Sequence, residues 1–461
     1  MAITAAFMMP HPPLIIPEIG KGGEQNIQAT IDAYGQAAQR IARLGPETIV
    51  LISPHQVMYA DYFHISPGAG ASGDFGSFGA AQVTIQAAYD TDFVNLLCGM
   101  AQSRNISAGT LGERDPRLDH GTMVPLSFVD AYRTDYKLVR IGLSGLSLAA
   151  HYDLGTCVQD TADALGRRIV VIASGDLSHR LLESGPYGFR EEGPLYDRRI
   201  MDVMERGAFE ELFDFSEGFC EKAGECGHRS FAVMAGALNK KAFTAKRYSY
   251  EGPFGVGYGI CGYEVTGSDA AKDFKALYQA KEQNRLAAQR AKEDCYVRLA
   301  RDTIETFIRT GEKITTPDDL PKELYETQAG VFVSIKKDGG LRGCIGTIRA
   351  VQASVAEEII QNAISAATED PRFSPVLKEE LPWLSLSVDV LGDAERIDSE
   401  DALDVKRYGV IVTNGSRRGL LLPNLDGVDT AAEQVAIAKR KAGILEHENV
   451  LLERFEVVRH F

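Results

Sequence analysis

The sequence predicts an α/β fold: an N-terminal domain with a mostly parallel sheet flanked by helices, followed by a smaller α+β domain with an antiparallel sheet. The chain has 461 residues, which exceeds the size at which single hydrophobic cores stop growing. Continuous apolar runs alternate with amphipathic stretches in the first half, as in parallel sheets covered on both faces. The composition becomes charged and Ala-rich from about residue 270. We therefore expect domains at 1–267 and 291–461, joined by a helical connector at 268–290.

The first domain is predicted to alternate strands and helices along the chain. An apolar run at 2–9 precedes a stretch at 24–45 whose apolar residues recur at helical spacing, and the strand "ETIVLIS" follows. The pattern continues with helical stretches at 90–105 and 148–166 and strands at 136–144, 168–174, 241–251 and 257–267. The Gly- and Ser-rich segment 66–80 lacks the pattern of a phosphate loop, and we expect a long loop or lid there.

The second domain is predicted to combine tandem strands with intervening helices. An opening helix carries Val297, Ala300, Ile304 and Phe307 on one face. Strands are expected within 330–350, 384–392 and 408–423, and helices at 354–370 and 431–443. Tandem strands of this kind favour an antiparallel sheet.

Composition and charge exclude several classes of protein. The chain has 49 basic and 64 acidic residues, a net charge of −15, and no basic stripe, so we expect no binding to nucleic acid. No apolar run is long enough for a membrane span. The seven cysteines form no C-x-x-C pair, and the first residues lack the features of a secretory signal. We expect a cytoplasmic protein with reduced thiols, and self-association stays open.

Three histidines follow apolar runs that are predicted to be strands. His11 lies in "MMPHPP", His55 in "SPH" and His179 in "SGDLSH". Ligands of open α/β sheets bind beyond the carboxyl ends of the strands, so these side chains are expected to converge. Neutral imidazole is the commonest side-chain ligand of transition metals, and a flanking proline restricts the turn that carries the ring. The alternative for any single histidine is a hydrogen-bonded turn residue.

Two neighbouring residues are candidates for a third metal ligand. Glu225 and Cys226 precede a helical apolar run in "AGECG". Glu225 would complete the two-histidine, one-carboxylate set of Fe(II) oxygenases, whereas Cys226 would suit a softer ion. The sequence leaves both open, and the carboxylate would also suit the positive end of the helix without any metal. His120, in "RLDHGTMVPL", is equally consistent with a loop residue bonded to Asp119.

The motifs "MMPHPP", "SPH", "LDHGTMVPL", "SGDLSH" and "AGECG" occur in an order that resembles the class III extradiol dioxygenases of the LigB type, whose fold the Memo family shares. The resemblance covers about residues 1–265. It implies Fe(II) held by His11, His55 and Glu225, with His179 as acid and base and His120 orienting substrate or oxygen. Memo-like relatives carry a cysteine at or near the glutamate position, which here could be Cys226. Another divalent transition metal (Zn, Mn or Cu) therefore stays open.

The string "LRGCIGTI" is the most specific feature of the second half. Cys344 could be a buried small side chain, or it could be a nucleophile beside an anion-binding Arg342. With "ATEDPRFSPVLKEEL" and "GLLLPNLDG", this string resembles the AMMECR family over about residues 285–461. The combination of the two domains resembles the AmmeMemoRadiSam system. That resemblance implies association with a radical-SAM protein and names no substrate.

Three hypotheses for function follow from these features, and whether the protein is an enzyme stays open. The first is an Fe(II)-dependent ring-cleaving dioxygenase that acts on a small aromatic substrate, a catechol or aminophenol, with O₂. The second is a metal-binding scaffold that serves a radical-SAM partner without turnover. The third, a cysteine hydrolase built on Cys344, has the least support because no histidine lies near it in the sequence.

Overall fold

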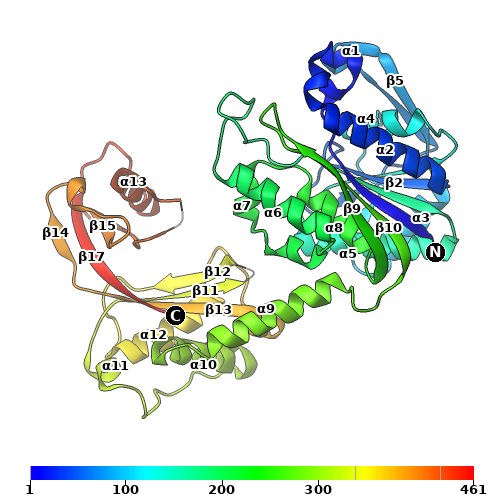
Figure 1. The fold of residues 1–461 in the computed structure, drawn as a ribbon. Helices are drawn as coiled ribbons and strands as arrows, with labels where there is room; N and C mark the ends of the chain where they lie inside the picture. The colour runs from blue at the N-terminus through cyan, green and yellow to red at the C-terminus, as the bar shows by residue number, and fades with distance from the viewer. Residues whose placement is uncertain (1, 338, 426) are drawn as a thin grey trace. The chain divides into compact units, whose positions relative to one another are not determined.

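The computed structural model describes residues 2–337, 339–425 and 427–461. The chain forms two compact units, Met1–Ala280 and Lys281–Phe461 (Figure 1). Within the described ranges, no helix combines the length and apolar character needed to cross a membrane.

The first unit is built on a six-stranded sheet in the order β7-β2-β8-β1-β10-β9. The pairs β7–β2, β2–β8 and β8–β1 are parallel, and β1–β10 and β10–β9 are antiparallel. The strand bounds are β1 Ile3–Met9, β2 Thr48–Ser53, β7 Lys137–Gly142, β8 Ile169–Ser174, β9 Lys241–Glu251 and β10 Tyr258–Ser268. The mostly parallel sheet that the sequence predicts is confirmed.

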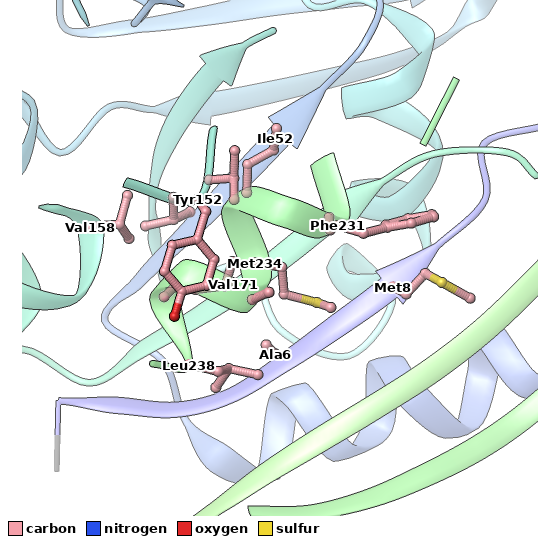
Figure 2. Close-up of a cluster of buried hydrophobic side chains, with 14 of the residues drawn as sticks. Ala6, Met8, Ile52, Tyr152, Val158, Val171, Phe231, Met234 and Leu238 are labelled. Carbon is pink, nitrogen blue, oxygen red and sulfur yellow. The ribbon is translucent and has the colours of Figure 1, made fainter. Parts of the chain in front are cut away.

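Helices cover both faces of this sheet (Figure 1). The helix bounds are α1 Pro17–Gly20, α2 Gln28–Leu44, α3 Thr91–Ser103, α4 His120–Asp130, α5 Leu148–Leu165, α6 Glu192–Arg206, α7 Glu217–Ala223 and α8 His228–Ala237. Alternate residues of β1 enter different cores: Phe7 packs in the cluster with α2 and α4, and Met8 packs in the cluster with α5 and α8. Figure 2 shows the second cluster, in which Phe231 and Met234 of α8 lie against the strands. The apolar runs are continuous because both faces of the strands are buried.

The Gly-rich segment 66–80 is not the long loop that its composition suggested. It contains β4 (Gly70–Phe75) and the start of β5 (Ala80–Ala88), which pair antiparallel as a hairpin. Phe75 and Ala80 are fully buried, so apolar packing holds the hairpin despite its glycines. The prediction of a loop was wrong because this packing outweighs the low strand propensity of Gly and Ser. A separate two-stranded sheet pairs β3 (Phe63–His64) with β6 (Ala108–Gly109).

The second unit contains a seven-stranded antiparallel sheet, in the order β12-β11-β13-β17-β15-β16 with β14 against β17. This confirms the predicted α+β class. The strand bounds are β11 Val331–Lys337, β12 Gly340–Gly346, β13 Leu384–Leu391, β14 Glu395–Ile397, β15 Tyr408–Asn414, β16 Arg417–Leu421 and β17 Leu451–His460. The helices are α9 Phe274–Arg290, at the boundary of the two units, and α10 Cys295–Thr310, α11 Lys322–Glu326, α12 Val355–Thr368 and α13 Ala431–Lys441. Val297, Ala300 and Ile304 of α10 are buried in the core that α10 forms with α12 and this sheet.

Candidate metal centre

His11 and His55 meet at the carboxyl-end edge of the parallel sheet. His11 follows β1 and His55 follows β2, and β8 lies between these strands. Their Nε2 atoms are 2.9 Å apart. Together with the Sγ of Cys226 they form a group whose donor atoms all lie within 4.8 Å of one another. His11 is buried, Cys226 is half-buried and His55 is exposed, so the group opens toward solvent on one side.

The side chain of Ser174 fixes the tautomer of His11. Ser174 ends β8, and its hydroxyl donates to the carbonyl of Gly121 at 2.6 Å. A serine hydroxyl has a single proton, so the contact of 2.9 Å between Ser174 Oγ and His11 Nδ1 requires the imidazole to donate. His11 therefore carries its proton on Nδ1. Its Nε2 lone pair is left facing His55 and Cys226, as in histidines that bind metal ions.

Two glycines let Cys226 approach this edge. A Cβ added to Gly175 would lie 2.2 Å from the Cα of Gly227, so the "SGD" and "ECG" segments pack backbone against backbone. The Sγ of Cys226 consequently lies 3.6 Å from His11 Nε2 and 3.3 Å from the amide nitrogen of Asp176, which donates to it. Burial, together with the charges of Asp176 and Glu225, raises the thiol pKa well above its ordinary value. Binding an ion as thiolate would therefore release a proton.

The Glu225 carboxylate is not part of the donor group and instead forms a hydrogen bond at the N-terminus of α8. Its Oε2 accepts the backbone N–H of His228 at 2.6 Å, at the N-terminus of α8, and the Tyr196 hydroxyl also contacts the carboxylate. Burial raises the pKa of Glu225 to about 7. Among the described residues, the donor group contains Cys226 and not Glu225. The structure thus places the thiol, rather than the carboxylate, beside the two histidines.

His120 lies beside the donor group at the first position of α4. Its ring centroid is 4.0 Å from that of His55 and 5.4 Å from that of His11. Asp119 caps the helix by accepting the amide of Thr122 at 3.0 Å. Burial, followed by the proximity of His55, lowers the pKa of His120 to about 4. The ring is therefore neutral near pH 7, which suits its place at the positive end of a helix.

His179 lies close enough to His11 and His55 for the imidazoles to influence one another's protonation. Its Nε2 is buried and unpartnered among the described residues, and its ring centroid lies 5.2 Å from that of Tyr187. Burial, His55 and Arg180 lower its pKa to about 4, in that order of importance. A neutral imidazole with a free nitrogen is able to accept a proton from a bound molecule.

The donor set fits a transition metal ion. Ligand nitrogens at about 2.0–2.1 Å and sulfur at about 2.3 Å from one ion lie about 3–4 Å from each other. The 2.9 Å between the two Nε2 atoms and the 3.6 Å between His11 Nε2 and Cys226 Sγ are close to that spacing. Imidazole binds iron, zinc, copper and nickel, and thiolate favours the softer ions of that series. The carboxylate of the Fe(II) triad that the motifs implied is absent from this set. The donor set is therefore compatible with transition metal ions other than Fe(II).

A cavity of about 480 Å³ lies next to His55 and His120. Phe78 of the β4–β5 hairpin contributes an aromatic ring to its wall, which also contains six charged side chains: Asp74, Arg114, Asp115, Arg117, Asp119 and Arg140. The centroid of this ring is 5.3 Å from that of His120. The hairpin therefore forms one side of the cavity.

Arg342 and Cys344 both make structural contacts within the second unit. The Arg342 guanidinium donates to Glu380 at 3.0 and 2.8 Å and to the carbonyl of Ser374 at 2.8 Å. Cys344 pairs with Ser334 across β12 and β11, and its amide donates to Asp370 at 2.8 Å. These contacts hold the segment after α12 against β12. They occupy most of the donors that an anion would need on Arg342.

Ser174 and Asp176 were not selected from the sequence, and Asp119 was named there only as a possible partner of His120, although all three position the histidines. Ser174 orients His11, and Asp176 accepts the His11 amide at 2.7 Å. Asp119 accepts the Ser53 hydroxyl at 2.5 Å, and that hydroxyl accepts the His55 amide at 3.2 Å. Ser174 and Asp176 occur in the "SGDLSH" segment that was singled out only for its histidine. The sequence signal that could have identified Ser174 and Asp176 is that both are polar residues within this motif.

The comparisons with known proteins agree with this organisation. The family model described as the catalytic LigB subunit of aromatic ring-opening dioxygenase matches residues 5–261, and the AMMECR1 model matches residues 297–460. A Clostridium acetobutylicum protein is 40% identical over 100% of this chain and 99% of its own length. A Thermotoga maritima protein is 48% identical over 36% of this chain and 96% of its own.

A solved structure of an uncharacterised Pyrococcus horikoshii protein is 35% identical, covers 36% of this chain and 88% of its own, and has a TM-score of 0.34. The two family models and the Clostridium acetobutylicum relative confirm both resemblances inferred from the motifs at the level of the family. The chain belongs to the family of the catalytic LigB subunit of aromatic ring-opening dioxygenase, joined here to an AMMECR1 domain.

Proposed function

We propose that the first unit is a metal-dependent ring-opening dioxygenase, with Fe(II) as its ion and a catechol or aminophenol as its substrate. One observation carries the proposal: two further histidines, His120 and His179, lie beside a three-residue donor group without belonging to it. A purely structural metal site has no use for additional neutral imidazoles at its open side, whereas a catalytic site needs an open position and nearby proton carriers.

Each residue of the site would have a distinct role. His11, His55 and Cys226 would hold the ion, and Ser174 would keep His11 in the required tautomer. Bound Fe(II) supplies the electron transfer that lets O₂ react with an aromatic ring. His179 takes a proton from the substrate hydroxyl at its unpartnered Nε2 and returns it later, and His120 orients the substrate or oxygen.

The test combines metal content with oxygen uptake. We expect full-chain protein purified without oxygen to contain near-stoichiometric iron and to consume O₂ with a member of a panel of catechols and aminophenols. His11→Ala should lose both properties, and His179→Ala should keep the iron and lose oxygen uptake. His447→Ala, at an exposed histidine of the second unit, is the matched control. The proposal would be contradicted if iron-loaded protein consumed no O₂ with any member of the panel.

A second function is favoured by the thiol in the donor set. Cys226 suits zinc or copper, and the unit would then be a metal-binding component that serves a radical-SAM partner without turnover. This proposal expects bound zinc or copper, no oxygen uptake, and binding of the partner through the "LRGCIG" face of the second unit. Unchanged partner binding by Arg342→Glu would argue against that face.

A further inference from the structure

The backbone of Cys344 in the second unit is held from two directions, while its side chain is half-buried. Its amide donates to Asp370 at 2.8 Å, and Arg372 donates to its carbonyl at 3.2 Å. The hydroxyl of Ser334, its partner across β11 and β12, donates to the Sγ at 3.3 Å. These contacts fix the position of the thiol.

Two cations lie beside this thiol. The Arg372 guanidinium contacts the thiol as well as the Cys344 carbonyl. Lys441, the last residue of α13, lies close enough to interact electrostatically with both Cys344 and Arg372. No local pattern in the sequence connects Lys441 with Cys344, because the fold of the second unit brings α13 and β12 together.

The charges of this cluster do not cancel. Asp370 accepts the Nε and Nη2 protons of Arg372 at 2.9 and 2.6 Å, so this arginine is paired. Lys441 is exposed and has no hydrogen-bond or ion-pair partner in the described part of the chain. Burial of its ammonium lowers the pKa of Lys441; Cys344 opposes this shift and the positive charge of Arg372 adds to it. Two cations and one carboxylate leave one positive charge without a counter-ion.

Arg372 and Lys441 are better placed than Arg342 to bind an anion beside Cys344. The Arg342 guanidinium already donates to both carboxylate oxygens of Glu380 and to a backbone carbonyl. Lys441 keeps all three of its N–H donors, and an anion next to it would offset the repulsion from Arg372.

We propose that Cys344 is a nucleophilic thiol, and that Arg372 and Lys441 hold the carboxylate of a small monoanionic electrophile against it. Reactive cysteines occur in partly exposed, electropositive surroundings of this kind, whereas fully buried ones are inert. One uncompensated positive charge matches a carboxylate better than a phosphate monoester, which carries about −1.5 to −2 at pH 7. This site is independent of the metal centre in the first unit and of the function proposed for it.

The chemical step is a displacement at carbon. The sulfur–carbon bond forms while the bond between that carbon and its leaving group breaks. The leaving group departs with the bonding electron pair, and the thiol proton passes to water. No oxidant or reductant takes part.

Alkylation of the full chain with a matched pair of reagents tests the proposal. Iodoacetate carries a carboxylate and iodoacetamide is its neutral amide, and both form the same sulfur–carbon bond and release iodide. The ratio of the two rates at one thiol largely cancels its exposure and nucleophilicity, and peptide mass spectrometry resolves each cysteine. Cys295 is the internal reference, because it is also half-buried but lies near the acidic residues Asp294 and Glu323. We expect the iodoacetate-to-iodoacetamide ratio at Cys344 to exceed that at Cys295 by about tenfold or more.

Variants of α13 assign this preference to a particular charge. Lys441→Gln should lower the ratio at Cys344 by at least about threefold, and Lys441→Arg, which keeps the charge, should retain it. Arg440→Gln is the matched control, because it removes an equal charge from the neighbouring exposed residue. Equal ratios at Cys344 and Cys295, or a Cys344 that reacts with neither reagent while Cys295 does, would overturn the nucleophilic site. A ratio that Lys441→Gln leaves unchanged, or that Arg440→Gln lowers as far, would overturn the role of Lys441.

Discussion

The Nδ1 of His11 lies 2.9 Å from the Oγ of Ser174, and the same hydroxyl donates to the carbonyl of Gly121. The serine therefore links the ends of β1 and β8 to the start of α4 and presents the Nε2 of His11 to the open side. Such outer contacts orient a metal ligand and fix its protonation state. The first two predictions follow from this arrangement.

Replacing Ser174 with alanine should weaken metal binding while leaving the fold intact. Loss of the acceptor frees His11 to adopt the other tautomer, so we expect the dissociation constant of the ion to rise about 10–100-fold. Competition with a chelator of known affinity measures it. Ser230→Ala is the control, because Ser230 is equally buried and its Oγ has no hydrogen-bond partner within the described residues. An unchanged constant in Ser174→Ala would contradict the role given to the hydroxyl.

Cys226 and Glu225 should respond differently to removal of their functional groups. Cys226→Ala removes a donor, and we expect metal affinity to fall by more than about 100-fold, beyond the effect of an outer contact. Glu225→Gln should retain the ion and lose only stability, because this side chain serves the N-terminus of α8. Protein loaded with cobalt would report the thiolate through its charge-transfer absorption. An ion that depends on Glu225 and ignores Cys226 would reverse the assignment.

The general position of the site was predictable from the sequence, but its donor set was not. Parallel strands end at one edge, so apolar runs followed by His11 and His55 are sufficient to predict that these residues meet. The choice between Glu225 and Cys226 depends on the direction of two neighbouring side chains, which is set by the contact of Gly175 with Gly227 across 52 positions of chain. No local pattern encodes such a contact. The same holds for the hairpin at 70–88, which long-range packing stabilises.

Gly175→Ala should disturb the donor group and the fold together. The added Cβ would lie 2.2 Å from the Cα of Gly227, and neither backbone is free to yield, so we expect a loss of about 1–3 kcal/mol in the free energy of unfolding and weaker metal binding. Gly99→Ala is the matched control: no atom lies within 4 Å of its added Cβ, and a helical alanine is favoured over glycine. Equal stability of the two variants, measured by urea unfolding, would refute the close packing.

Replacing Arg342 should lower the stability of the second unit, by an amount that depends on pH. The Arg342 guanidinium, the largest influence, lowers the pKa of Glu380 to about 2. The pair therefore contributes fully above the ordinary pKa of a glutamate, near 4.3, and its contribution is lost as the pH falls from there toward 2. Arg342→Met should cost about 2 kcal/mol at pH 7, the usual worth of hydrogen bonds to charged groups, and progressively less below pH 4. Thermal unfolding of the full chain at several pH values measures this, with Arg349→Met as control. A cost that stays constant down to pH 2.5 would show that the pair is not its source.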